Sequence, residues 1–521
     1  MRARSIALVA TVTFAISGCA FIERVHIHPT GTGLSTGGVV LDGTGHHAAF
    51  AVVAPVAGTG AFHARDLAVR NLQVGNTETI VVDPFANGRN HYLVVTDLSA
   101  DARFVAFQAF DRRPGGIVQI FVYDRQTQSL DRVSRGIADA APNGSSFEPS
   151  LTDNGRYVAF SSLASNLVAG DTNGTSDIFV FDRTTRGTAR ASTNAAGGQR
   201  PGSSTDGSIS GDASAVVYRY QPGFGDPPIE GDYIAVQGFI PWSVPSFLDA
   251  PKYDEPFSTG GTGVHPTISH NGRYISYAYR TAQSWQQPTH YFITRYDRTL
   301  GLYTDISRTA GGLVPTADSV HPTISDDGTR IAFFSAATNL VPTQTDGVVH
   351  VYVREVDRQR TRLVSSGLLL DVGNADSGTT ETDGDRPPSI SDDGRYVGFT
   401  SNATNLVEPP AGDAGLYVRS TAFITVDSAA PSALPDGITT VVTITGTGFQ
   451  TETQWGLSAN DRSRWTLLSS ATIDDDTATM TIRIQPDATP GPINIVAINP
   501  GNSWGPYTGA ANWCLGCLTI T

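Results

Sequence analysis

Apolar and polar residues alternate in short runs along most of this chain. In the segment RYVAFSS (156–162), tyrosine, alanine and serine alternate with valine and phenylalanine, which is the period of a β-strand. No helical period of useful length appears in this region. The runs belong to a phrase of strand, turn and strand, with PSLTDNGRYVAF as a clear example, and the phrase recurs along the chain. Its copies lie at residues 41–50, 99–107, 149–160, 208–218, 266–277, 322–333 and 388–399.

The copies follow one another at a nearly constant distance. Between turn residues the spacings run from 53 to 66 residues, and such a period is typical of repeat architectures. Each unit predicts four short strands, and four strands repeated seven times predict an all-β fold, a β-propeller with seven blades. Because the first and fourth units are degenerate, six or eight blades remain open. The turn residues are Gly45, Ala102, Gly155, Ala213, Gly272, Gly328 and Gly394.

The repeat ends near residue 421, and residues 422–521 have a pattern of their own. Strand-like alternation continues there without the turn phrase. About 100 residues of alternating short strands predict a small β-sandwich. The last strand contains Cys514 and Cys517, and we expect an exported protein to join them in a disulfide.

The N-terminus predicts export. Met1–Arg4 carries positive charge, and Ile6–Ile16 is an apolar stretch too short to span a bilayer. The sequence Ile-Ser-Gly-Cys that follows resembles the bacterial lipobox, which implies that residues 1–19 are a lipoprotein signal peptide and that Cys19 carries the lipid. The alternative is an ordinary signal peptide cut near Ala20. The Gly- and Thr-rich residues 20–36 are predicted to be a flexible tether. We therefore expect a protein lipid-anchored to the bacterial cell membrane or outer membrane.

Composition narrows the functional classes. The net charge is −14 and the pI is near 5.2, which argues against a nucleic-acid partner because such proteins need a basic face. Gly33–Gly37 match the G-x-S-x-G nucleophile pattern, but no α/β domain follows them, so we do not expect a catalytic serine.

Both regions resemble known families. Residues 322–333 (PTISDDGTRIAF) resemble the repeat of TolB-type propellers, and the resemblance covers residues 37–421. Residues 422–521 resemble the IPT/TIG immunoglobulin-like (Ig-like) domain. The first resemblance implies a docking platform for proteins, although a fold alone fixes no function. The residues that match the IPT/TIG motifs are Val442, Ile444, Gly446, Gly448, Phe449, Pro490, Gly491, Val496, Asn499, Pro500 and Gly501.

The repeat also predicts a ring of residues at the propeller axis. Innermost strands line the axis, so the residue that precedes the first strand's proline, or its equivalent, should recur around it. Consecutive units bring Glu148, Asp206, His265 and His321 to one side of this ring. Two carboxylates and two imidazoles can ligate zinc, manganese or iron; a polar channel rim without metal is the alternative. The ring in chain order is Gly38, Val95, Glu148, Asp206, His265, His321 and Pro387.

Two loops are further candidates. Asp171, Asn173 and Asp177 have the spacing of calcium ligands, but an Asx-rich turn explains the same residues. The stretch from Gln221 to Val264 is long and aromatic, so it binds a partner or packs onto the propeller, with YIAVQGFI (233–240) the best candidate for a strand. The aromatic residues considered for partner binding are Tyr233, Trp242, Phe247 and Tyr253.

Two functions remain open from the sequence. The first is a non-enzymatic, envelope-anchored interaction protein whose propeller and Ig-like module bind another protein or an envelope glycan. It is favoured because no nucleophile and base occur in a recognisable context, and it requires no cofactor. The alternative is a propeller enzyme or metalloprotein, similar to polysaccharide lyases, with a divalent metal at the channel.

Overall fold

The computed structural model divides the chain into two compact units, Ile22–Thr421 and a unit that contains Ala422–Thr521. Almost all regular structure is β-strand; the single short helix of the described residues is a 3-10 turn, η1 (Ile137–Asp139). Within the described part of the chain, no helix is long and apolar enough to cross a membrane. The described residues are 22–26, 38–55, 62–86, 90–194, 196–223, 233–238, 246–248, 262–280, 290–309, 311–341, 345, 347–366, 372–378, 386–407, 415–421, 425–447, 449, 453–458, 464–473, 477–498 and 511–521.

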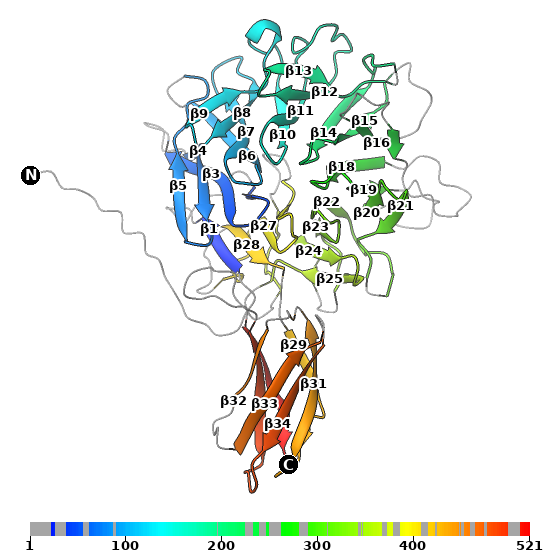
Figure 1. Cartoon of the computed structure of the whole chain (residues 1–521). Coiled ribbons are helices and arrows are strands. Elements are labelled where there is room, and N and C mark those ends of the chain that lie inside the picture. Colours follow the sequence, from blue (N-terminus) through cyan, green and yellow to red (C-terminus); the bar gives the residue numbers. More distant parts are fainter. Residues whose placement is uncertain are drawn as a thin grey trace, which may run out of the picture. The chain divides into compact units, whose positions relative to one another are not determined.

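The larger unit consists of four-stranded antiparallel sheets arranged around a common axis, as Figure 1 shows. This arrangement is that of a β-propeller. In sequence order the sheets are β2 (Val40–Leu41), β3 (His47–Pro55), β4 (Phe62–Asn71), β5 (Asn76–Ile80); β6 (His91–Leu98), β7 (Phe104–Asp111), β8 (Val118–Asp124), β9 (Ser129–Arg132); β10 (Ser146–Leu151), β11 (Tyr157–Ser162), β12 (Asp177–Asp182), β13 (Gly187–Arg190); β14 (Ser203–Ile209), β15 (Ala215–Gln221), β16 (Tyr233–Gly238), β17 (Ser246–Leu248); β18 (Thr262–Ile268), β19 (Tyr274–Arg280), β20 (Phe292–Asp297), β21 (Leu302–Asp305); β22 (Ser319–Ile324), β23 (Arg330–Ser335), β24 (His350–Glu355), β25 (Arg360–Leu363); and β26 (Ser389–Ile390), β27 (Tyr396–Ser401), β28 (Gly415–Ser420), β1 (Ile22–His26).

The seventh sheet is completed by the N-terminal strand. β1 pairs antiparallel with β28, with Ile22 opposite Arg419 and Arg24 opposite Tyr417. The two ends of this unit therefore meet in one sheet, and β2 of the first sheet contacts β26 of the seventh. This corrects the predicted flexible tether (residues 20–36) at Ile22–His26, which form a strand, while its other residues lie outside the described part of the chain. The strand was not predicted because a run of five residues is too short to show a clear β period, and a tether shows none.

Local chemistry explains the repeated turn. Its third or fourth residue adopts a left-handed backbone conformation in each copy, with φ of 63° at Gly155 and 57° at Ala102. At Gly155 an added Cβ would lie 2.2 Å from a ring carbon of Phe104 in the preceding sheet, so only glycine fits there. The predicted turns are thus confirmed, and glycine serves both backbone conformation and close packing between sheets.

Arginine–aspartate pairs fasten the second strand of a sheet to its third. Arg156, directly after the turn, donates two hydrogen bonds to Asp182 (3.1 and 2.8 Å), and Arg183 donates to the carbonyl of the turn residue Gly155 (2.8 Å). Bidentate pairs of this geometry are among the stronger polar contacts in proteins. The same pairing occurs in the second and fifth sheets, as Arg103 with Asp124 and Arg273 with Asp297.

The hydrophobic core of this unit lies between neighbouring sheets. One cluster joins Val122 and Ile120 of β8 to Phe160 of β11 and Phe179 of β12, and all four side chains are buried. Equivalent clusters join the other consecutive sheets from the first to the seventh. The apolar alternation seen in the sequence therefore fills the spaces between blades rather than a single central core.

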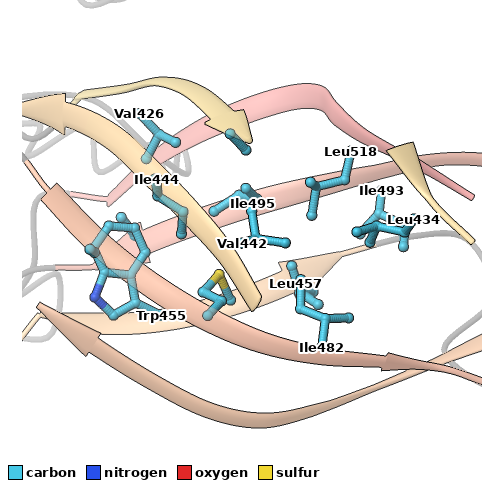
Figure 2. Packing of buried hydrophobic residues seen from close by; sticks show 14 of the residues in the cluster. Val426, Leu434, Val442, Ile444, Trp455, Leu457, Ile482, Ile493, Ile495 and Leu518 are labelled. Carbon is cyan, nitrogen blue, oxygen red and sulfur yellow. The ribbon is translucent and has the colours of Figure 1, made fainter. Parts of the chain in front are cut away.

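The C-terminal unit is a β-sandwich of two four-stranded sheets. The IPT/TIG-like positions Val442, Ile444 and Phe449 are at most 2% exposed and belong to the core between the sheets, part of which Figure 2 shows. One sheet has the order β29 (Thr425–Ala430), β31 (Thr439–Thr447), β34 (Thr477–Ile484), β33 (Trp465–Thr472); the other has β30 (Ala433–Leu434), β36 (Ala511–Ile520), β35 (Gly491–Ile498), β32 (Gln454–Ser458).

Candidate functional site: the propeller channel

A cavity of about 460 Å³ lies on the propeller axis. Its wall comes from the innermost strand of every sheet and the residues next to it. All seven residues of the predicted ring line it: Gly38, Val95, Glu148, Asp206, His265, His321 and Pro387. The structure therefore brings the predicted site residues to one cavity, and their chemistry can be examined there.

Four of these residues have a strained backbone. The φ angles of Glu148, Asp206, His265 and His321 lie between 52° and 56°, in the left-handed region that most residues avoid. Each occupies the first position of a β-bulge. In the third sheet, for example, pairing passes from Phe147 opposite Ser161 to Ser150 opposite Ala159, which leaves two residues opposite one.

A bulge with a left-handed first residue normally has glycine at that position. The second bulge residue is proline in three of the four sheets, Pro149, Pro266 and Pro322, and glycine in the other, Gly207. Proline is tolerated because the bulged residue need not donate to the ladder. The repeat thus explains the bulge, but it does not explain why four titratable residues stand where glycine would be less strained.

Glu148 and Asp206 form a carboxyl pair in the channel. Burial by the channel wall, together with the neighbouring charge of Asp206, raises the pKa of Glu148 to about 7. The Glu148 side chain remains open to the cavity, since the residue is exposed. At neutral pH its carboxyl group is therefore partly protonated and can donate as well as accept a hydrogen bond.

His265 and His321 form an imidazole pair beside the carboxyl pair. Their rings are stacked, with centroids 3.7 Å apart and an angle of 21° between the planes. Burial and the neighbouring His265 lower the pKa of His321 to about 3. The His321 ring is consequently neutral at physiological pH and offers one donor and one acceptor nitrogen.

The rest of the wall is divided between charge and apolar surface. Arg386, just before the first strand of the seventh sheet, lines the cavity and lowers the pKa of Glu148 in opposition to burial. On the first and second sheets the lining includes the apolar residues Val39, Val40 and Val95 and the polar residues Thr96 and Asp97. The channel thus offers acidic, basic and neutral polar groups together with patches of apolar surface.

The metal site predicted from the sequence requires at least three of these side chains to converge. Among the described residues, no three His, Cys, Asp or Glu side chains come close enough together to hold a metal ion. The four predicted ligands share one cavity as two separate pairs.

His270 ties the turns together at the other end of the innermost strands. Its Nδ1 lies 2.7 Å from Asp153 of the third sheet and 3.0 Å from Asp392 of the seventh. Burial alone would lower the pKa of His270, but the hydrogen bond to Asp153 and the charges of Asp392, Asp153 and Asp97 outweigh it and raise the pKa to about 9. Burial also raises the pKa of Asp97 and of Asp392 to about 6.

Backbone hydrogen bonds connect the same turns. The N–H of Asp153 donates to Gly211, that of Asp212 to His270 and that of Asp326 to Asp392, each at 2.8 to 3.1 Å. The turns thus form a linked chain around the axis, with a protonated histidine bridging two carboxylates within it.

Sequence reasoning missed this bridge and Arg386. The signal for the bridge was present: the residue after the turn's first Ser or Thr is Ala, Asp, Gly, His, Asp and Asp in the second to seventh units. One histidine among three aspartates at equivalent positions around a ring is the pattern of an ion-pair cluster.

The calcium-like loop is satisfied internally. Arg190 lies 3.4 Å from Asp171 and 3.3 Å from Asp177, and Gln199 donates to both carboxylates. Asn173 donates to Asp177 rather than turning its oxygen toward it. A guanidinium group therefore occupies the place at which a cation would neutralise these carboxylates, and the sequence pattern is explained without calcium.

The aromatic stretch is only partly described. Tyr233 begins β16 and is 9% exposed, so it is a buried strand residue and not a partner-binding loop residue. The strand predicted over 233–240 is confirmed for Tyr233–Gly238. Phe247 lies in β17, opposite Ala235, and Trp242 and Tyr253 lie outside the described residues.

The cysteines are partly described as well. Cys517 is disulfide-bonded, and the pairing of β35 with β36 passes from Ile495 opposite Cys514 to Ile493 opposite Leu518. The residues between the two cysteines thus form a bulge in β36. The side chain of Cys514 and the whole of Cys19 lie outside the described residues, so the pairing and the lipidation stay predictions.

Comparisons with known proteins add little beyond the fold. No protein-family model matches the chain, and no curated protein matches it. Matching solved structures include TolB from Acinetobacter baumannii (16% identity, 62% of this chain and 65% of that one, TM-score 0.37). Others are an oligogalacturonate lyase from Vibrio parahaemolyticus (11%, 77% and 93%, 0.46) and an acylaminoacyl peptidase from Pyrococcus horikoshii (13%, 72% and 49%, 0.41). At such low identities and TM-scores, the likeness carries no argument about activity or partners.

Proposed function

We propose that this chain is a non-enzymatic interaction protein of the cell envelope. In this proposal a seven-bladed, TolB-type propeller presents the channel as its binding site, and an IPT/TIG-like Ig-fold module follows it. The ligand is a segment of another envelope protein or of an envelope glycan that enters the channel with both polar and apolar groups.

The observation that carries the proposal is the strain at the channel wall. Glu148, Asp206, His265 and His321 hold a left-handed backbone at bulge positions where glycine would be less strained. Strained residues that cluster around one cavity are typical of ligand-binding sites, because selection for the side chain outweighs the loss of stability. A merely structural bulge has no need of four titratable side chains.

A lipid on Cys19 would place the propeller close to the membrane. β1 begins at Ile22, so only Ala20 and Phe21 separate it from the lipid-bearing residue. Two intervening residues span at most about 10 Å between Cys19 and the strand. In this proposal the outer edge of the seventh sheet therefore lies at the lipid headgroups.

The metalloenzyme alternative has less support. Three ligands close together are the minimum for a catalytic zinc site, and the described residues supply no such group. Elemental analysis of protein purified without chelators tests this directly. A stoichiometric metal that is lost from the variant His265→Ala plus His321→Ala would replace the present proposal with the alternative.

Affinity capture from crosslinked cells tests the proposal itself. We expect the wild-type chain to capture a protein or glycan that the variant Glu148→Ala plus Asp206→Ala does not. Val74→Ser, at an exposed position of the first sheet's outer turn, is the matched control and should capture the same partner. Equal capture by the channel variant and the wild type would show that the binding site lies elsewhere.

A further inference from the structure

A second cavity lies between the fifth and sixth sheets, away from the channel. Its volume is about 400 Å³, and we call it the rim pocket. It is bounded by the end of β21, the segment that follows it, the end of β24 and the turn after β24. The lining residues are Thr304, Asp305, Arg308, Gly312, Arg354, Val356 and Gln359.

Arg354 places a buried positive charge in this pocket. The residue is 6% exposed, and its Nη1 donates to the carbonyl of Arg308 (3.3 Å) and to Thr361 Oγ1 (3.0 Å). Both of these acceptors are neutral. Burial lowers the pKa of Arg354, and no described carboxylate opposes that effect.

Two other arginines of this unit with little exposure lie against carboxylates. Arg190 lies against Asp171 and Asp177, and Arg362 lies 3.3 Å from Glu355. Asp305, the carboxylate in the wall of the rim pocket, accepts a hydrogen bond from Arg308 Nε (3.0 Å) and lies 2.9 Å from Arg308 Nη2 in an ion pair. The pocket thus carries two guanidinium groups and one carboxylate, which leaves a net positive charge. A buried charge without a counter-ion is costly, and a bound anion would offset that cost.

Apolar side chains lie next to the pocket in the sequence. Leu302 precedes Thr304 by two residues in β21, so both point to the same face of the strand. Leu302 is 59% exposed, and Leu313, directly after Gly312, is 68% exposed. Exposed large apolar residues beside a polar cavity favour a ligand with an apolar part.

We propose that the rim pocket binds an organic oxyanion, a carboxylate or a phosphate ester, whose charged group pairs with Arg354. Arginine suits both groups because its planar fork of donors matches two oxygens of either. Thr304 and Gln359 add hydrogen-bonding groups to the wall, and Arg308 adds a second cation at the rim. This site is separate from the channel, so the proposal does not depend on the function proposed above.

Calorimetric titration of the full chain with phenyl phosphate and with inorganic phosphate tests the assignment. Ionic strength is held constant with sodium chloride, so that general screening does not change. We expect phenyl phosphate to bind about tenfold more tightly than phosphate, because its ring buries apolar area. Acetate in a third titration distinguishes a carboxylate site, which it should occupy, from one that requires phosphate.

The variant Arg354→Gln should bind phenyl phosphate at least tenfold more weakly than the wild type, since the charged partner of the phosphate is lost. The control is Arg70→Gln, because Arg70 donates to the exposed residues Gly75 and Thr77 of the first sheet and lies outside the pocket. If Arg354→Gln does not fold, Arg308→Gln on the pocket rim replaces it, and the same loss of affinity for phenyl phosphate is expected. Absence of binding to any probe, or equal affinity in the wild type and the Arg354 variant, would overturn the proposal. Equal affinity for phosphate and phenyl phosphate would overturn the organic part of it.

Discussion

The strain at the channel wall predicts that replacing strained residues there with glycine will leave the protein more stable than replacing them with alanine. The change is Glu148→Gly plus Asp206→Gly, compared with Glu148→Ala plus Asp206→Ala. Both variants delete the carboxyl pair, so both should lose the channel ligand. Only the glycine variant also relieves the left-handed backbone, where φ is 53° and 56°.

The magnitude follows from the backbone alone. A non-glycine residue in the left-handed region costs roughly 1–2 kcal/mol, and the extra freedom of glycine in the unfolded chain offsets roughly 0.5–1 kcal/mol of the gain. The glycine variant should therefore be about 2 kcal/mol more stable than the alanine variant. Both lose the hydrogen bond that Glu148 accepts from the backbone of Asp206, so this loss cancels in the comparison.

Equilibrium unfolding in urea is the suitable assay. The propeller comprises Ile22–Thr421, and at roughly 2.1 cal/mol/K per residue its entropy of unfolding is about 0.8 kcal/mol/K. A difference of about 2 kcal/mol would then move the melting temperature by only about 2–3 °C. A urea midpoint resolves it better, provided that the slopes of the transitions agree.

Two results would refute this reasoning. If the alanine variant equals or exceeds the glycine variant in stability, the bulges do not hold the two residues in a left-handed conformation. If both variants are much less stable than the wild type, the carboxyl pair serves the fold and not a ligand.

Three further predictions follow from the described contacts and the sequence. His270→Ala should cost about 1–2 kcal/mol near pH 7.5, a moderate value because channel water screens the ion pairs; urea unfolding checks it. The pKa of His270 is raised from 6.5 to about 9, so its contribution is full below about pH 6.5 and is lost as the pH rises through 9, while Asp392, with a pKa of about 6, loses its charge below pH 6. The stabilities of wild type and variant should therefore differ most near pH 6 to 6.5 and converge as the pH rises to 9, and a difference that is undiminished at pH 9.5 would contradict the bridge. Cys19→Ala should move the protein from the membrane fraction to the soluble fraction, and unchanged detergent partitioning would show that no lipid is attached there. Residues 423–521 should unfold cooperatively as an isolated sandwich, and Cys514→Ser should destabilise them by about 2 kcal/mol at most, because the loop closed by the disulfide is short; a chain without a thermal transition would contradict the boundary.

Much of the propeller could be predicted because each unit repeats the same phrase of strand, turn and strand. Equivalent positions in a closed repeat must fall on a ring, so aligning the turn phrase was enough to bring Glu148 and His321 to the same cavity. The left-handed turn could be predicted as well, since Asn-Gly and Asp-Gly favour positive φ. In these cases the local sequence pattern and the closed arrangement of the sheets lead to the same prediction.

Contacts across sheets could not be predicted in the same way. The bridge from His270 to Asp153 and Asp392 depends on the diameter of the ring, which no spacing along the chain records. The loop at Asp171 looked like a cation site because its partner, Arg190, lies at the end of β13, the second strand after the loop, and only packing brings the two together. Strand β1 was missed because its partner β28 lies almost 400 residues away in the sequence.

The distribution of stabilising contacts explains how the channel tolerates strained residues. Bidentate pairs such as Arg156 with Asp182 join the second and third strands of the second, third and fifth sheets, and apolar clusters fill the spaces between sheets. The linked turns close one end of the innermost strands. None of these contacts uses the bulge residue of an innermost strand. Because these contacts lie away from that position, a polar side chain can replace glycine at the bulge at a cost of only about 1 kcal/mol. Four consecutive units carry such a replacement, and all four side chains line one cavity. A ligand in the channel is the simplest physical reason for that choice.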